Sequence, residues 1–164
     1  MAEKQSILVI LGKGGHTEQL LKLVDMLGEK YRYEYAIGRK DHLSQKKITK
    51  PGRVFFIQNY REMEDKSLIP VIFKVFKTAF QSINVLMKCE SNVILTCGPA
   101  IGIPISVLGK LLFRKKLIFL ESWSRVYSKS TTGKWLYNIA DISFIQWPQQ
   151  KKNYPNAVYA GRLG

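Results

Sequence analysis

The feature that most constrains the fold is a regular alternation of short apolar segments with longer amphipathic ones. Segments rich in β-branched and aromatic residues are predicted strands, at 6–11, 31–37, 53–58, 92–97, 116–121 and 142–147. Helices are predicted after the glycines near position 15, ending before Gly28, and at 66–88, 100–113 and 131–139. A strand followed by a helix, repeated along the chain, predicts an α/β fold with a parallel sheet and helices on both faces.

Length and composition favour one domain over residues 1–164, because 46% of the residues are hydrophobic and no linker-like stretch divides the chain. Cys89 and Cys97 have no spacing typical of a zinc site or a disulfide framework, so they are predicted core residues in a reducing compartment. The apolar run before Gly12 is too short for a signal peptide or a membrane span, so we expect a chain that is neither secreted nor threaded through a membrane.

The stretch Gly12–Gly15 directly follows the first predicted strand and opens the first helix. Ligands of parallel sheets bind at the carboxyl ends of strands, where backbone N–H groups and a positive helix end can hold a phosphate or diphosphate. As a dinucleotide fingerprint the stretch fails, because Thr17 stands where glycine or alanine is required and Arg39 and Lys40 stand near the place of the acidic ribose partner. The alternative is that the glycines serve only a tight turn.

His16 lies at the start of the same helix, where the positive helix end disfavours an imidazolium. It is therefore a candidate neutral hydrogen-bond partner or general base. The alternative is a surface histidine without a functional role. A second strand, turn and helix at 96–109 offers another anion-receptive helix end, with Pro99 and Pro104 expected early in the helix. The alternative interpretation of this stretch is again a compact turn that binds no ligand.

Glu121 ends the fifth predicted strand and is followed by many hydroxyls and cations, a composition suited to phosphate oxygens. This carboxylate could serve as a general base or could pair with Arg125 to hold the loop. The helix at 67–89 carries a wide apolar face with lysines on the other side, which indicates either an interfacial helix on anionic lipid or a helix covering the sheet. The apolar positions are Ile72, Val75, Phe76, Ala79, Phe80, Ile83 and Met87.

Several motifs occur in order along nearly the whole chain. They are GKGGHTEQLLKL, NYRE followed by Ser67, TCGP, ESWSRV, TGKWLY, AD, IQWP and YPNAVYAG. Together they resemble the oligosaccharide-biosynthesis proteins that form the acceptor-side half of two-subunit, GT-B-type glycosyltransferases, the split relatives of MurG-like transferases. The resemblance implies a Rossmann-like domain, equivalent to the N-terminal half of a GT-B enzyme, that lies on the cytoplasmic face of the membrane.

The same resemblance implies a polyprenyl-diphosphate-linked sugar as acceptor and a separate small subunit that carries the UDP-sugar site. It implies no cofactor and no metal. The resemblance further implies a general-base role for His16 or Glu121. The residues implied for the acceptor and its diphosphate are Gly12, Gly14, Gly15, Thr17, Gly98, Pro99, Ser122 and Arg125, and those for the membrane are Lys74, Phe76, Lys77 and Phe80.

Eukaryotic members of this family carry an N-terminal membrane anchor, which we do not expect in this protein, so the bacterial capsule and exopolysaccharide members, of the PssD type, are expected to resemble it better in this respect. A chain that forms one wall of a two-walled cleft is expected to have little transferase activity alone. The net charge of +14 suits a diphosphate acceptor in an anionic leaflet. Two other readings are a basic nucleic-acid-binding module, for which no sequence motif is present, and a stand-alone nucleotide-dependent Rossmann enzyme.

Overall fold

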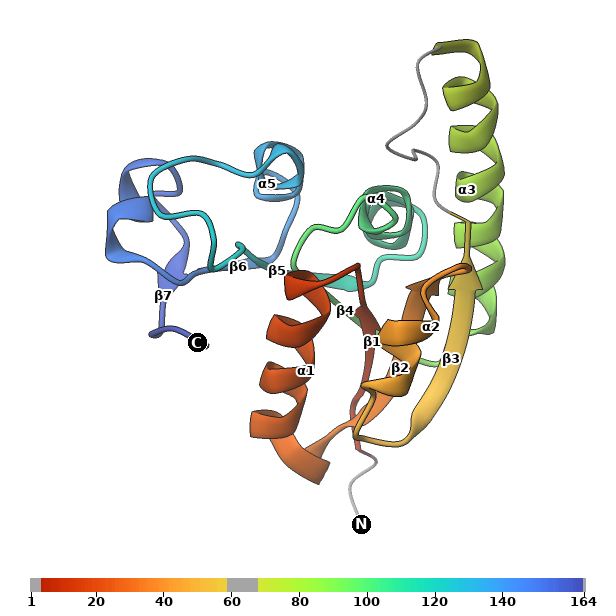
Figure 1. Ribbon diagram of the computed structural model, residues 1–164, viewed down its shortest axis with the longest axis horizontal. Coiled ribbons are helices and arrows are strands. Elements are labelled where there is room, and N and C mark those ends of the chain that lie inside the picture. The colour runs from red at the N-terminus through yellow and green to blue at the C-terminus, as the bar shows by residue number, and fades with distance from the viewer. Residues whose placement is uncertain (1–3, 59–67, 164) are drawn as a thin grey trace.

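The computed structural model describes residues 4–58 and 68–163, with the side chains of 68–75 excepted. The described residues form one seven-stranded sheet in the order β3-β2-β1-β4-β5-β6-β7, and every neighbouring pair is parallel (Figure 1). The strands are β1 Ser6–Ile10, β2 Arg32–Gly38, β3 Gly52–Ile57, β4 Val93–Thr96, β5 Lys116–Leu120, β6 Ile142–Ile145 and β7 Val158–Tyr159. The predicted α/β fold with a parallel sheet is confirmed.

The helices are α1 Gly15–Leu27, α2 His42–Lys46, α3 Leu68–Lys88, α4 Gly102–Leu111 and α5 Thr131–Leu136, with 3-10 turns η1 Gly28–Lys30 and η2 Pro148–Lys152. All four predicted helices are present, although positions 66 and 67 lie outside the described residues. The short elements α2 and β7 were not predicted. Pro99 was expected inside a helix, but α4 begins later because the Pro99 carbonyl accepts a hydrogen bond from Gly102 N–H in a preceding turn.

Alternating residues of β1 explain why helices cover both faces. Ile7 and Val9 belong to a core cluster with Leu20 and Val24 of α1. Leu8 and Ile10 face the opposite way, into a second cluster that contains residues of α3, α4 and α5. The two apolar clusters lie on opposite faces of the central strands, so the sheet is a buried middle layer.

The order of the strands places a topological switch point between β1 and β4. From β1 the chain continues into α1 on one face, whereas from β4 it continues into α4 on the other (Figure 1). Ile10 pairs with Thr96 at the carboxyl ends of these two strands. The turns that follow must therefore lie side by side, which is where open α/β sheets bind their ligands.

Helix α3 packs on the sheet through both aliphatic and polar side chains, but not through its phenylalanines. Val85 and Leu86 belong to the second core cluster, and Thr78 and Ser82 are buried beside them. Phe76 and Phe80 are 72% and 66% exposed, so the interpretation that they cover the sheet is wrong. The helix extends past the carboxyl ends of β2 and β3 (Figure 1). Its exposed apolar side chains therefore need another partner than the core.

We expect Phe76→Ser and Phe80→Ser together to change the free energy of unfolding by only about 0.5 kcal/mol, because both side chains are already in water. Leu86→Ala on the buried side of the same helix should cost about 2–5 kcal/mol. Urea unfolding followed by circular dichroism measures both. If the two variants lost the same free energy of unfolding, the phenylalanines would have to be core residues.

Candidate functional site

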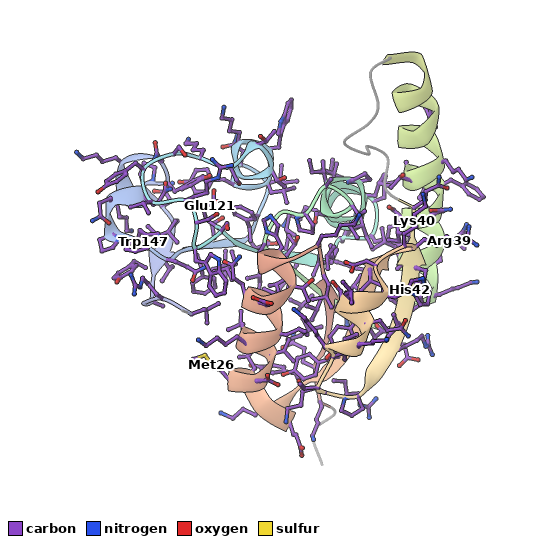
Figure 2. The ribbon with its side chains drawn as sticks, in the orientation of Figure 1. Met26, Arg39, Lys40, His42, Glu121 and Trp147 are labelled. Carbon is purple, nitrogen blue, oxygen red and sulfur yellow. The ribbon has the colours of Figure 1, made fainter. Side chains whose placement is uncertain are left out.

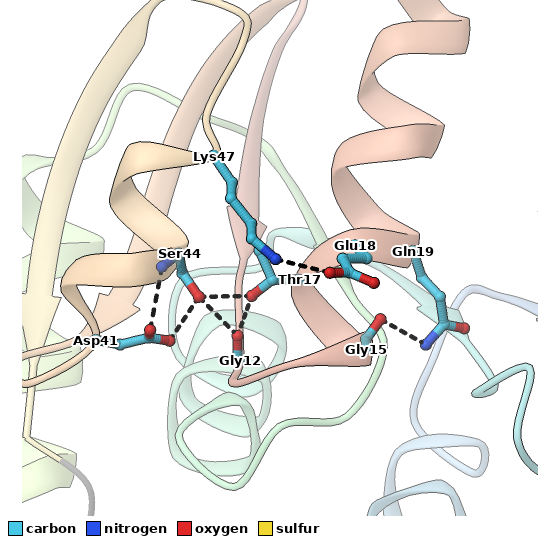
Figure 3. Close-up of polar contacts among 8 residues, drawn as sticks. All are labelled: Gly12, Gly15, Thr17, Glu18, Gln19, Asp41, Ser44 and Lys47. Carbon is cyan, nitrogen blue, oxygen red and sulfur yellow. Dashed lines mark hydrogen bonds and ion pairs between the residues drawn. The ribbon is translucent and has the colours of Figure 1, made fainter.

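The glycine turn after β1 is held from behind by two hydroxyls (Figure 3). The carbonyl of Gly12 accepts hydrogen bonds from Thr17 Oγ1 and, at 3.0 Å, from Ser44 Oγ. Asp41 in turn accepts from Ser44 N–H at 3.1 Å and from Ser44 Oγ at 2.6 Å, which caps α2. Ser44 and Thr17 are buried, so α2 fixes the position of the turn.

Sequence reasoning expected Thr17 at the ligand, and the structure corrects this. Its hydroxyl is buried and already hydrogen-bonded to Gly12 and Ser44. Residue Gly12 is buried as well. The spacing of Asp41 and Ser44, typical of a helix N-cap, is the signal that could have predicted the support behind the turn.

The front of the turn is open. Gly14 and Gly15 are exposed, and Gly14 has φ +63°, a left-handed conformation that suits glycine. No side chain caps α1, and nothing in the described part of the chain accepts a hydrogen bond from the N–H groups of Gly15 and His16. Two free donors at a positive helix end can hold an anionic oxygen.

The turn after β4 packs directly on the first turn. A Cβ at Gly12 would overlap the Cβ of Pro99, so only glycine permits this approach. Pro99 is buried in that contact rather than turned toward a ligand, which corrects the expectation for it. Gly98 has φ +88° and is half-buried, and its carbonyl accepts from Thr132 Oγ1 of α5 at 2.8 Å.

His16 is half-buried at the junction of the two turns. Its Nδ1 lies 3.3 Å from the sulfur of Cys97, which directly follows β4. Burial lowers the pKa of His16 below 6.5, and nearby Arg125 lowers it further, while Glu121 acts in the opposite direction. The ring is therefore neutral at pH 7, as expected from its place at the helix end, but burial is the main cause.

Glu121 is 1% exposed and its carboxylate is enclosed by donors. Oε1 accepts from Ser122 N–H at 2.8 Å. Oε2 accepts from Ser130 N–H at 3.2 Å, from Ser130 Oγ at 3.1 Å and from the hydroxyl of Tyr154. Burial of the Tyr154 phenol, its hydrogen bond to Glu121 and the negative charge of Glu121 raise the pKa of Tyr154, so the phenol keeps its proton. A carboxylate surrounded in this way holds the loop that follows β5 and has little room for a substrate hydroxyl.

The ion pair that was the alternative for Glu121 is absent among the described residues. The guanidinium of Arg125 instead donates to Ser128 Oγ at 3.5 Å and is exposed. Ser122 is buried, and its Oγ lies 3.0 Å from Ser124 Oγ. Of this loop, Arg125 therefore reaches the surface as expected, and Ser122 does not.

Two buried glutamines, which the sequence analysis did not single out, connect this loop to the glycine turn. Gln19 Nε2 donates to the Gly15 carbonyl at 3.2 Å, and its Oε1 accepts from Trp123 N–H at 2.9 Å. Gln146 Nε2 donates to the same Oε1 at 2.7 Å and to the Glu121 carbonyl at 3.0 Å. The network ties β5, β6 and α1 into one rigid frame around the open turn.

Cationic side chains surround the same edge of the sheet. Lys13, Arg39 and Lys40 are exposed at the carboxyl ends of β1 and β2. Figure 2 shows Arg39 and Lys40 beside α3, with Glu121 on the other side of α1. Within the part of the chain that the structure describes, no group of three His, Cys, Asp or Glu side chains is placed to hold a metal ion.

Fold and site together define a Rossmann-like α/β domain with an open glycine turn at the switch point of its sheet. MurG of Acinetobacter baumannii has the same fold, with a TM-score of 0.72 at 12% identity over 88% of this chain and 42% of MurG. A UDP-GlcNAc 2-epimerase of Neisseria meningitidis has a TM-score of 0.71 at 9% identity over 97% of this chain and 47% of its own. The chain thus spans less than half of these solved proteins, and the likeness concerns the fold.

A family model described as "Oligosaccharide biosynthesis protein Alg14 like" matches residues 7–163, so the chain belongs to the Alg14-like oligosaccharide biosynthesis family. The mouse protein named UDP-N-acetylglucosamine transferase subunit ALG14 is 31% identical over 98% of this chain and 84% of its own length. Its counterpart in Schizosaccharomyces pombe is 30% identical over 96% of this chain and 83% of its own. Both relatives are eukaryotic, so the closer likeness to bacterial capsule members stays a prediction.

Tyr154→Phe should lower the free energy of unfolding by about 1–3 kcal/mol, because it removes one donor from the buried carboxylate of Glu121. Tyr159→Phe is the matched control, since its ring is 43% exposed. Chemical denaturation of both variants measures the difference. Equal stability of the two variants would show that Glu121 does not depend on this contact.

Proposed function

We propose that this chain is the acceptor-binding, membrane-associating subunit of a two-component glycosyltransferase. A small partner subunit supplies the UDP-sugar site, and the acceptor is a glycan linked to a polyprenyl diphosphate. Membership of the Alg14-like family and the names of the curated relatives support the role as a transferase subunit.

The observation that carries the proposal is the placement of an open anion-receptive turn and an exposed apolar helix face at one edge of the sheet. Thr78 Oγ1 donates to the Gln58 carbonyl at 2.9 Å, and Gln58 directly follows β3. The exposed Phe76 and Phe80 are therefore near the carboxyl end of the sheet, as the glycine turn is. A lipid-linked diphosphate needs both features together: an apolar contact with the bilayer and donors for its phosphates.

Within this proposal the N–H groups at Gly14–His16 bind the diphosphate, with Gly98 beside them and Arg125 adding charge. His16 takes the proton from the attacking acceptor hydroxyl through its ring nitrogen Nε2. Glu121, Ser122, Thr17, Gly12 and Pro99 are buried and act by positioning these groups.

The membrane surface is formed by Phe76, Phe80 and the exposed Lys77, and it places the chain peripherally on the cytoplasmic face of an anionic membrane. The side chain of Lys74, which was also expected there, lies outside the described residues. No helix among the described residues is long and apolar enough to cross a bilayer. The same proposal assigns the acceptor to the synthesis of a capsule or exopolysaccharide.

The full chain should bind vesicles that contain phosphatidylglycerol more tightly than vesicles of phosphatidylcholine alone, and added salt should weaken the binding. Phe76→Ser with Phe80→Ser should weaken it at least about tenfold, because two exposed rings no longer enter the interface. Met26→Ser is the control, since Met26 is 71% exposed but lies on α1, away from α3 (Figure 2). Unchanged flotation of the phenylalanine variant, or tighter binding to duplex DNA than to vesicles, would contradict this surface.

In a reconstituted pair with the donor-binding subunit, His16→Ala should lower kcat by about 10²-fold, the usual size of a general-base contribution. Association with the partner should be unchanged. His42→Ala is the matched control, because this second histidine is exposed on α2. The isolated chain should show no tight binding of UDP-N-acetylglucosamine in equilibrium dialysis. Full transfer by the His16 variant, or by the chain alone, would overturn the assignment.

A further inference from the structure

Cys97 was expected to be core filler, and it is buried, but its sulfur contacts both the backbone and the ring of His16. The thiol donates to the His16 carbonyl at 3.2 Å. The same sulfur lies 3.3 Å from His16 Nδ1. The backbone of Cys97 also forms a hydrogen bond with the His16 ring, which favours the protonated form of the ring.

Counting protons around this sulfur determines which nitrogen of the ring carries the hydrogen. A thiol has one proton, and here it points to the His16 carbonyl. Burial raises the pKa of Cys97 well above its usual range, so the thiol keeps this proton at pH 7. The sulfur can then meet Nδ1 only as an acceptor. Nδ1 must therefore carry the ring hydrogen, and Nε2 a lone pair.

We propose that Cys97 is a positioning residue whose sulfur accepts the Nδ1–H of His16 and holds the neutral ring in the tautomer that offers Nε2 as a base. The tautomer follows from the contacts of this chain alone. The identity of the hydroxyl that Nε2 deprotonates rests on the function proposed above.

The proton balance of the transfer step is then complete. Nε2 accepts the proton of the acceptor hydroxyl while the hydroxyl oxygen forms the new bond to the sugar. The bond between the sugar and UDP breaks, and UDP leaves with its electron pair. The ring becomes an imidazolium, and its Nδ1–H stays directed at the sulfur. Two charged groups act on the ring: Glu121, directly after β5, favours this cation, and Arg125 in the following loop opposes it.

Nitrogen-15 NMR of the full chain labelled at histidine tests the tautomer directly. We expect wild-type His16 to be protonated at Nδ1 near neutral pH. Cys97→Ala should shift His16 toward a mixture of the two neutral tautomers, and Cys97→Ser, which restores an acceptor, should largely recover the wild-type spectrum. Cys89→Ala, which removes the other buried thiol, should leave it unchanged. A wild-type ring protonated at Nε2, or an unchanged spectrum in Cys97→Ala, would overturn the proposal.

Transfer by the reconstituted pair separates this inference from the proposed function. Cys97→Ala should lower kcat by about tenfold at unchanged KM, because sulfur hydrogen bonds are weak and the loss of the base itself costs more. Cys97→Ser should recover most of the rate. If the tautomer is the expected one but neither the Cys97 nor the His16 substitution slows transfer, the base role in the proposed function is wrong. If the tautomer is the opposite one, the role of Cys97 is wrong whatever the rates.

Discussion

The close contact between the turns that follow β1 and β4 is the constraint on which the rest of the site depends. Gly12 has no Cβ, and Pro99 occupies the space where one would be. Because the two turns meet in this way, Cys97 at the end of β4 reaches His16 at the start of α1. A larger residue at Gly12 would separate the strands' carboxyl ends and with them the histidine from its sulfur.

Buried polar side chains on both sides of this contact hold it in place. Asp41 and Ser44 hold the Gly12 carbonyl from one side, and Gln19 with Gln146 holds the Gly15 carbonyl from the other. Buried polar groups of this kind are costly unless every one is satisfied, so they specify a single geometry. The consequence is a turn in which the N–H groups of Gly15 and His16 meet no acceptor among the described residues, while the carbonyls of Gly12 and Gly15 are occupied.

The order of strands and helices could be read from the sequence because each buried strand is a short apolar run and each helix carries an apolar stripe. The helix α2 was missed because it is only one turn long, and β7 because two residues carry no period. For the site, the sequence located the two turns that the structure brings into contact, since a glycine cluster after a strand has few alternatives in a parallel sheet. It could not separate the exposed Gly14 and Gly15 from the buried Thr17 and Glu121.

That separation depends on which way a side chain turns, which spacing along the chain does not encode. The same holds for α3, where the aromatic stripe resembles a core face by period, but Thr78 and Ser82 lie with Val85 and Leu86 on the buried side. In the stretch from Phe76 to Ser82, polar residues are buried and phenylalanines are exposed, the opposite of the usual amphipathic pattern. The exposed phenylalanines are available to a second apolar environment.

The central claim is that this chain holds the acceptor diphosphate at its glycine turn and leaves the activated sugar to another polypeptide. Amide NMR of the full chain, titrated with a short-chain prenyl-diphosphate-linked N-acetylglucosamine and separately with UDP-N-acetylglucosamine, tests it most directly. The account predicts saturable shifts centred on Gly14, Gly15 and His16 with the first ligand and none with the second. Shifts at those amides with the nucleotide sugar alone, or shifts from the diphosphate that avoid the turn, would contradict it.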